Sequence, residues 1–482
     1  MVNFMAYTRG SSSVFDLWES MGNPGWDWDT VFPYFKKSTH FTPPSTTNNS
    51  QITFDPSFYN ASGGPLQISF GEYTQPDDQY WYPALQEIGV PKAVDFNGGN
   101  AVGVAHETTT INPADESRSS AYTSFYAAAK SRPNLHVMTD TLVEQVLIRG
   151  NSSSAAAYGV KYTSSSGVPS FAYASKEVIV SAGAVQTPQL LMLSGVGPKA
   201  TLQKFNIKPY AYLEGLGQRF QDHASFYVNV EVSASLPTIG LLLQNSTAFT
   251  AAINEWGSNH SGPLASMNGD TIGFQRLTNA QLTAIGAQDL IALGSDWPNI
   301  EFLLLPAYDN PGFPNPPNAT GNYLTIAVAL VSPTSMGSIS ISSTNINDPP
   351  IIDVNYLSTT DDQQVAIQGF KNAIAIAESN AFKPVFLGRN KVVPPAASVA
   401  TDAAILEYVR NVMTTIWHAS GTAAMMPQAS GGVVDSQLRV YGVKNLRIVD
   451  ASVQPRITNQ HVQAVVYMIA ERAADFLKAQ YA

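Results

Sequence analysis

The chain has 482 residues, of which 44% are hydrophobic and 13% charged, and it carries a net charge of −10. This length allows two or three domains with a sizeable core, and the acidic balance argues against nucleic acid or an anionic membrane as the main partner. No apolar run approaches the roughly 18 residues that a membrane-spanning helix needs. Because cysteine is absent, disulfides, a thiolate nucleophile and cysteine-ligated metals are excluded, and no metal site is predicted.

The localisation stays unknown from the sequence. The start, "MVNFMAYTRG", lacks the basic region and apolar stretch of a signal peptide. Glycosylation sequons are compatible with secretion of the full-length protein. They occur at Asn48, Asn60, Asn151, Asn245, Asn259 and Asn318.

The first part of the chain alternates helix-like and turn-rich segments. Aromatic residues at helical spacing in "WDWDTVFPYFKKS" predict a helix within 26–38, and the segment 41–65 is rich in turn formers. Two further helices are predicted within 77–89 and 117–132. Residues 135–140, "LHVMTD", begin a series of short strands.

Strands cluster without intervening helices in the block 225–415, for example in "SFYVNVEVS", "NIEFLLLPAY" and "YLTIAVALV". Such clustering is typical of an antiparallel sheet beside a separate domain. The last residues return to strand, turn and helix. The expected fold class is therefore α/β (α+β), with a substrate domain whose antiparallel sheet is flanked by helices.

A buried strand, a turn of small residues and a helix follow one another in "KEVIVSAGAVQTPQLLMLSGVG". Thr187 is expected as the N-cap of this helix, Pro188 as its first residue and Gly195 as its end. Such a strand–turn–helix unit, called a crossing below, can present backbone N–H groups to a phosphate or a planar cofactor. It can equally be a tight turn in a packed core. The spacing alone leaves both interpretations open.

A second crossing of this kind lies in "NLRIVDASVQP", whose strand ends at Asp450 with Ala451 behind it. An acid at this place can accept hydrogen bonds from ribityl-type hydroxyls. An N-cap or Asx-turn aspartate is the alternative, and Asp450 considered alone favours it.

Two histidines stand close to these crossings. His418 lies in "TTIWHASGTAAMMP", where a histidine packed in the core is the ordinary interpretation. His461 lies at the start of the last amphipathic helix, whose N-terminus would lower its pKa and keep it neutral. A neutral imidazole there could donate to or accept from a substrate oxygen.

The dinucleotide fingerprint is not found in this chain. "GVGPKA", residues 195–200, formally fits G-x-G-x-x-A, but it follows a helix rather than a strand and contains Pro198. It is therefore not interpreted as a phosphate loop.

Several segments together resemble the glucose–methanol–choline (GMC) family of FAD-dependent oxidoreductases. "GAVQTPQLLMLSGVG" fits the family's second signature over its whole length, and "NFMAYTRG" resembles the segment beside the flavin. "LGQRFQDH" resembles the Val-Gly-x-Asn-Leu-Gln-Asp-His motif, with Arg219 and Phe220 in place of Asn and Leu. "NPGWDWDTVFPYFKKS", "WHASGTAAMMP" and "GVVDSQLRVYGVKNLRIVDAS" extend the resemblance to nearly the whole chain.

The resemblance implies oxidation of a small-molecule alcohol, an electron donor of the CH–OH type, with FAD as cofactor and O2 or another electron acceptor. His418 would remove the hydroxyl proton while hydride passes to flavin N5, and His461 would help to bind the oxygen. Small residues behind the base, Ala419, Ser420 and Gly421, would leave room for a flavin face.

The resemblance also implies a set of binding positions. Phe4 and Trp417 would line the substrate entrance, with core packing as the alternative for these aromatics. Asn3 and Met5 would contact the isoalloxazine, Val143 the adenine through its main chain, and Asp450 and Ala451 the ribityl–pyrophosphate stretch. The cofactor-binding positions implied in full are Asn3, Met5, Val143, Trp417, Asp450, Ala451 and Val462.

Members of the family normally open with a βαβ unit that carries G-x-G-x-x-G, and this chain begins after the place of that unit. It is therefore expected to be a fragment, with a Rossmann-like FAD-binding domain truncated at its N-terminus. This domain is expected in three pieces, 1–45, 105–224 and 416–482, and the substrate-binding domain in two, 46–104 and 225–415.

Two alternatives to an alcohol oxidase or dehydrogenase stay open. A flavin-containing lyase on the same scaffold would use both histidines without net redox chemistry. A remnant unable to retain FAD would be inactive.

Overall fold

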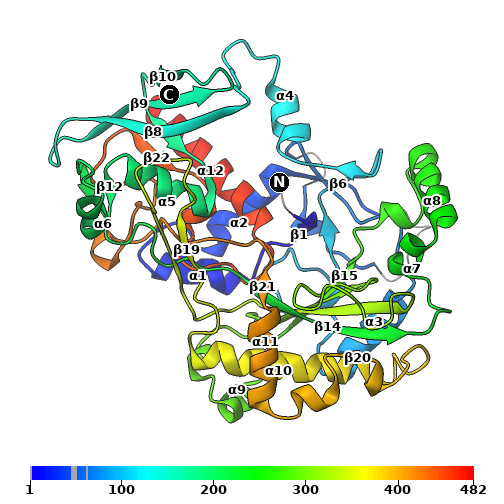
Figure 1. Ribbon diagram of the computed structural model, residues 1–482. Coiled ribbons are helices and arrows are strands. Elements are labelled where there is room, and N and C mark those ends of the chain that lie inside the picture. Colours follow the sequence, from blue (N-terminus) through cyan, green and yellow to red (C-terminus); the bar gives the residue numbers. More distant parts are fainter. Residues whose placement is uncertain (1–2, 45–51, 61–62) are drawn as a thin grey trace.

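The computed structural model describes residues 3–44, 52–60 and 63–482. Met1 and the sequon at Asn48 lie outside the described residues. The described chain forms two parts, one around the N- and C-terminal helices and one around a large antiparallel sheet (Figure 1).

The two crossings expected from the sequence lie side by side in the first part. Strand β11 (Val178–Val180) pairs in parallel with β22 (Leu446–Ile448), so both turns open at the same edge. Helix α5 (Gly183–Leu193) follows β11, and α12 (Gln463–Tyr481) closes the chain and packs on α2 (Trp28–Ser38). The parallel pairing explains how segments about 270 residues apart build one edge.

A twisted three-stranded antiparallel sheet covers one end of this part, in the order β10-β9-β8 (Figure 1). Its strands are β8 (Thr141–Arg149), β9 (Ala156–Ser164) and β10 (Pro169–Tyr173). Buried residues of α1 (Ser12–Ser20), α2, α5, α12, β8 and β9 belong to one hydrophobic core.

The second part is built on a seven-stranded sheet in which every pairing is antiparallel. The main path is β20-β14-β17-β16-β15-β4, and β21 also pairs with β14. The strands are β4 (Gly103–His106), β14 (Ala224–Val232), β15 (Thr271–Gln275), β16 (Ile300–Leu305), β17 (Asn322–Leu330), β20 (Val392–Val393) and β21 (Thr414–Thr415).

Helices cover the outer face of this sheet and leave its other face turned toward the first part (Figure 1). Helices α3 (Asp78–Glu87), α10 (Thr360–Ala377) and α11 (Asp402–Val412) share a second hydrophobic core with the strands. The expected mixed α/β class, with an antiparallel sheet flanked by helices, is confirmed.

The structure also contains the following helices and strands. The helices are α4 (Ala127–Ala129), α6 (Lys199–Lys204), α7 (Ile239–Gln244), α8 (Ser246–Asn259) and α9 (Asn279–Ile285). The strands are β1 (Ala6–Tyr7), β2 (Thr39–Phe41), β3 (Leu66–Ile68), β5 (Thr108–Thr109), β6 (Ile111–Asn112), β7 (Ser117–Arg118), β12 (Val196–Gly197), β13 (Ala211–Tyr212), β18 (Ser338–Ser340) and β19 (Ile351–Asp353).

Three local expectations were wrong. Residues 135–140 form no strand, because Val137 and Met138 are exposed and the segment has no strand partner among the described residues. The helix expected within 117–132 is reduced to one turn with π-type hydrogen bonds (Tyr122–Tyr126) and α4.

Helix α5 begins at Gly183 rather than after Thr187, so Pro188 lies inside the helix. Proline has no N–H for the carbonyl of Ala184 one turn earlier. The hydroxyl of Thr422 donates to that carbonyl instead, at 2.6 Å, which is why the helix tolerates the proline. Gly195, with φ +83°, follows the end of the helix as expected.

The domain boundaries stay a prediction. Strand β4 crosses the expected boundary between residues 104 and 105, since it pairs with β15 of the large sheet. Among the described residues, no helix combines the length and the apolar character needed to cross a membrane.

Candidate active site

His418 is positioned by the end of the large sheet. Strand β21 pairs with the start of β14, with Thr415 opposite Ala224, and the chain beyond it continues alongside the segment before β14. There Gln221 and Ser420 exchange two backbone hydrogen bonds, of 3.0 and 2.8 Å. This pairing places His223 and His418 opposite each other.

The carboxylate of Asp222 fixes the turn that carries His418. It accepts a hydrogen bond from the backbone N–H of His418 at 2.9 Å and from the hydroxyls of Thr415 and Tyr356, both at 2.5 Å. Trp417, between them in the chain, has φ +62°, a conformation that is unfavourable for a bulky residue and is held here by these contacts.

His461 is placed by the N-terminal segment of the chain. The side-chain oxygens of Asn459 and Gln460 accept hydrogen bonds from the backbone N–H groups of Ser11 and Gly10. The backbone N–H of His461 donates to Thr8 Oγ1 at 3.2 Å. Residues from the two ends of the sequence therefore position this imidazole just ahead of α12.

Three imidazoles lie in a row. The ring centroids of His223 and His418 are 5.0 Å apart, as are those of His418 and His461. A hydrogen bond of 2.9 Å joins Nδ1 of His223 to Nδ1 of His418. At the other end of the row, Nε2 of His461 donates to Oε1 of Glu301 at 2.7 Å.

The three imidazoles of the row differ in pKa and therefore in charge. Burial, together with the positive charge of His461, lowers the pKa of His418 well below its usual value and that of His223 to about 3. Burial by itself also lowers the pKa of His461, but the charge of Glu301, its hydrogen bond and the charge of Glu107 raise this pKa to about 9. At neutral pH His418 is therefore a neutral imidazole beside a charged one.

The expectation of a neutral His461 was wrong. It rested on the N-terminus of the last helix, whose partial charge acts on the imidazole through the dipole alone. A full negative charge at 2.7 Å inside the protein outweighs that effect.

A cavity of about 390 Å³ opens in front of His418 and His461. Its wall is mainly apolar and combines residues of both parts of the molecule. Phe4 and Trp417 stand at its exposed side with ring centroids 6.1 Å apart. The two residues are 58% and 49% exposed, which is unusual for large aromatics and places them where a ligand would enter. The wall also includes Asn3, Tyr227, Leu303, Leu305, Asp309, Ile416, Val462, Gln463, Val466 and Tyr467.

Asn3 lies next to the start of α12, and Met5 lies next to Thr110. Asn3 donates to Gln463 at 2.9 Å and accepts from the guanidinium of Arg118 and the backbone N–H of Met5. Met5 has φ +68°, and its carbonyl accepts from the N–H of Thr110 at 2.7 Å. The structure thus brings Asn3, Phe4, Trp417 and Val462 to one cavity with both histidines.

Asp450 forms hydrogen bonds with residues of both crossings. Its Oδ2 accepts from the hydroxyl of Thr187 at 2.6 Å and from the backbone N–H of Gly183 at 3.0 Å, and Oδ1 accepts from the N–H of Ser452. The aspartate is therefore an N-cap, which is the interpretation that its position in the sequence favours. It also connects α5 to the turn after β22 through hydrogen bonds. The carbonyl of Ala451 accepts from the N–H of Gly421 at 3.2 Å.

Gly421 does not leave space for a ligand. A Cβ at this position would lie 2.6 Å from the carbonyl oxygen of Arg219, so the glycine allows two backbone segments to approach each other. Val143 lies apart from the cavity, on β8, where it pairs with Tyr162. Strand β8 is an edge of its sheet among the described residues.

The residues at the two crossings fit a flavin dinucleotide. Ser181 and Ala182, at the end of β11, are exposed, and a Cβ on Gly183 would meet no atom within 4 Å. Small exposed residues at the end of a parallel strand and the start of a helix leave room for a large planar or phosphate-bearing group. Among the described residues, no three His, Cys, Asp or Glu side chains are grouped as metal ligands would be.

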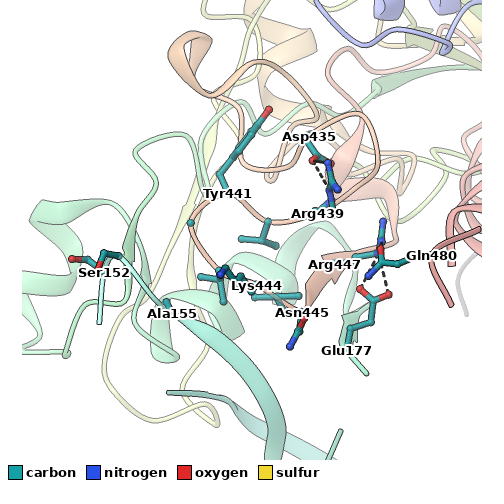
Figure 2. A pocket seen from close by; sticks show the side chains of 15 residues that line it. Ser152, Ala155, Glu177, Asp435, Arg439, Tyr441, Lys444, Asn445, Arg447 and Gln480 are labelled. Atoms are coloured by element: carbon teal, nitrogen blue, oxygen red, sulfur yellow. Dashed lines mark hydrogen bonds and ion pairs between the residues drawn. The ribbon is translucent and has the colours of Figure 1, made fainter. Parts of the chain in front are cut away.

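A second cavity, of about 380 Å³, lies at the opposite end of β11 and β22 (Figure 2). Four of its charged side chains are already paired, Arg447 with Glu177 and Arg439 with Asp435. Figure 2 shows the two side chains of each pair turned toward one another. No histidine lines this cavity, so the chemistry is assigned to the first one.

Three residues of the site were missed in the sequence. Glu301 interrupts the apolar strand "NIEFLLLP", and a lone acid in a buried strand is a signal of a paired charge. Glu107 is buried, and burial raises its pKa to about 8. His223 ends the segment "LGQRFQDH", but only the pairing of β14 with β21 shows that it faces His418.

Comparison with known proteins decides the family. Models described as "GMC oxidoreductase" match residues 1–225 and 333–470. The chain is 37% identical to "Dehydrogenase pkfF" of Emericella nidulans over 99% of its own length and 77% of that protein. The chain belongs to the GMC oxidoreductase family. FAD is accordingly its cofactor, and oxidoreductase is its enzyme class.

The names of further similar proteins describe different enzymes. The chain is 35% identical to "Patulin synthase" of Aspergillus clavatus, over 98% of this chain and 76% of that protein. Among solved structures, an FAD-dependent oxidoreductase from Chaetomium thermophilum has a TM-score of 0.90 and 29% identity, covering 100% of this chain and 85% of the other. A formate oxidase has a TM-score of 0.88 and 26% identity, covering 99% and 83%.

Proposed function

We propose that this GMC oxidoreductase oxidises the CH–OH group of a small-molecule alcohol. The observation that supports the proposal is the pair His418 and His461, which face one apolar cavity with ring centroids 5.0 Å apart and carry different charges. A neutral and a charged imidazole at one site suit the removal of a proton and the binding of the resulting oxygen anion.

In the proposed reaction, the neutral His418 takes the hydroxyl proton of the alcohol. His461 holds the oxygen of the same group, and negative charge growing on that oxygen is stabilised by the imidazolium. FAD, when bound, would supply the acceptor for the hydride that leaves the carbon. The two electrons would finally pass to O2 or another electron acceptor.

The cavity wall favours an apolar or aromatic alcohol. Leu303, Leu305, Ile416 and Val466 offer no hydrogen bond to a substrate, and a volume of about 390 Å³ suits a molecule with one or two rings. Phe4 and Trp417 would cover the bound ring and limit the access of water. Asn3, Met5 and Val462 would hold the isoalloxazine, Asp450 and Ala451 the ribityl–pyrophosphate stretch, and Val143 the adenine.

The test is anaerobic mixing of the purified, FAD-loaded protein with benzyl alcohol and its ring-substituted derivatives. Loss of the flavin absorbance on mixing, together with aldehyde formation, is expected. A protein that converts a hydroxynitrile without bleaching its flavin would be a lyase instead. If the full chain retains no flavin after incubation with FAD, the proposal is wrong for this chain.

A further inference from the structure

The cavity in front of the histidines extends along one face of the large sheet. Residues of β14, β17 and β16 lie opposite one another in rows across this sheet. Glu301, which contacts His461, belongs to the first row. Tyr227 and Leu303 line the cavity in the second row, and Leu305 lines it in the third. Because alternate residues of a strand are about 7 Å apart, the third row lies about 14 Å from the first. The cavity therefore has a far end, away from the histidines.

The loop after β16 is fixed to the third row by two buried polar side chains. Nδ2 of Asn229 donates to the backbone carbonyl of Asp309 at 2.8 Å, and the backbone N–H of Asp309 donates to Oγ1 of Thr325 at 2.9 Å. Asn229 and Thr325 lie opposite each other on β14 and β17, and both are completely buried. Buried polar groups are costly unless they are hydrogen-bonded, and here their partners include the backbone of this loop. The sheet thus holds Asp309 in a defined place at the far end.

The carboxylate of Asp309 faces the cavity without a partner from the protein. Among the described residues that line the cavity, Asp309 is the only acid, and lysine and arginine are absent. Partial burial raises the pKa of Asp309, and no hydrogen bond or positive charge from the described residues lowers it. The residue is nevertheless exposed, so a ligand can reach its carboxylate.

The hydroxyl of Tyr227 is the second polar group at this end. Burial, and to a smaller extent the charge of Asp309, raises the pKa of Tyr227, so the two groups are neighbours. Among the described residues, the hydroxyl has one hydrogen-bond partner, Ser225, at a long distance of 3.5 Å. Its own hydrogen is therefore available to a ligand as well.

We propose that Asp309 is a specificity residue, which favours alcohols that carry a protonated amine at the end opposite their CH–OH group. The inference rests on the proposed alcohol oxidation. The CH–OH group would lie beside the histidines, the apolar middle of the substrate against Leu303 and Leu305, and the ammonium at Asp309. An ammonium supplies a positive charge and hydrogen-bond donors, a hydroxyl supplies only a donor, and a carboxylate would be repelled.

The test compares substrates that differ only at the far end. The FAD-loaded full chain is given naphthalen-2-ylmethanol with one of four groups on C6: aminomethyl, hydroxymethyl, methyl or carboxylate. The aminomethyl compound is expected to have a kcat/KM about 5- to 50-fold above that of the methyl compound, mainly through KM. The hydroxymethyl compound should be intermediate and the carboxylate the poorest. High salt should reduce the preference, because it screens a partly exposed charge.

Substitution of Asp309 assigns the preference to this residue. Asp309→Asn keeps the size of the side chain but removes its charge, and it is expected to lower the amine-to-methyl ratio of kcat/KM by about fivefold or more. Because the ratio compares two substrates of one protein, it does not depend on the amount of active enzyme. Asp289→Asn is the matched control, since Asp289 is an exposed carboxyl that does not line the cavity, and it leaves the ratio in place.

A wild-type protein that shows no preference for the amine over the methyl compound overturns the proposal, even if the variant does not fold. An unchanged ratio in a folded Asp309→Asn protein overturns it as well. Asp309→Lys, with the opposite charge, should instead favour the carboxylate compound over the amine.

A binding measurement separates this inference from the proposed function. Naphthalen-2-ylmethylammonium has no CH–OH group, and its Kd, measured by calorimetry, should rise about 5- to 50-fold in Asp309→Asn. If no alcohol reduces the wild-type flavin but the ammonium binds in this way, the proposed function is wrong and Asp309 is still the group that binds the cation. If alcohols are oxidised but the ammonium binds equally to both proteins, the proposed function stands and the role of Asp309 is wrong.

Discussion

Nδ1 of His223 lies 2.9 Å from Nδ1 of His418, and both rings are buried. Two nitrogens at this distance share one hydrogen, so one ring must donate and the other accept. If His418 is to take a proton at Nε2, its hydrogen must sit on Nδ1, and His223 must accept it. The contact thus determines which nitrogen of the base is free.

His223 can be tested by two substitutions of different chemistry. Asparagine places an amide oxygen close to the position of Nδ1, whereas leucine removes the acceptor. We expect His223→Asn to reduce the flavin within about tenfold of the wild-type rate and His223→Leu to be about 100-fold slower, because only leucine leaves the tautomer of His418 unfixed. The measurement is anaerobic stopped-flow absorbance, with the FAD content as control. Equal rates in the two variants would show that His223 only fills space.

His418→Ala should abolish most flavin reduction by alcohol. Without the base, the alcohol keeps its proton and hydride transfer is disfavoured, so a loss of at least about 1,000-fold is expected with FAD still bound. His461→Ala should be damaging but less complete, since it removes a donor to the oxygen rather than the base. Single-turnover rates give both values. A nearly normal rate in His418→Ala contradicts its assignment as the base.

Glu107 gives the protein a pH-dependent stability. Burial raises the pKa of Glu107 to about 8 from an ordinary 4.5, so the folded state holds its proton more tightly than the unfolded state. This group therefore lowers the stability as the pH rises from about 4.5 to 8. We expect Glu107→Gln to have the same Tm as wild type near pH 4.5 and a higher Tm at pH 9. A Tm difference that does not change with pH would contradict this origin.

The hydroxyl of Thr422 should support α5 through the carbonyl of Ala184. Both groups are buried, and Pro188 cannot supply the missing N–H. Thr422→Val is expected to cost about 1–3 kcal/mol of unfolding free energy, measured by chemical denaturation, because it leaves a buried carbonyl unpaired. In a Pro188→Ala background the helix can donate its own N–H, so the same substitution should cost less. An equal cost in both backgrounds would rule out this explanation.

Local patterns in the sequence predicted the elements around the site. The strand and small-residue turn before α5, the stop at Gly195 and the amphipathic final helix depend on residues close in sequence, whose spacing is visible without a structure. His418 and His461 were found because they stand in motifs that such local segments carry. The strand expected at 135–140 failed for the same reason, since its local pattern does not supply a partner.

The tertiary structure alone decided how the histidines are charged. The hydrogen bonds His461–Glu301 and His418–His223 join residues 160 and 195 positions apart, and no periodicity links them. A pKa depends on burial and on the nearest charges, which exist only after the sheet packs against the first part of the molecule. The sequence therefore determined which imidazoles are present, while the packing determined that one is neutral and the other positive.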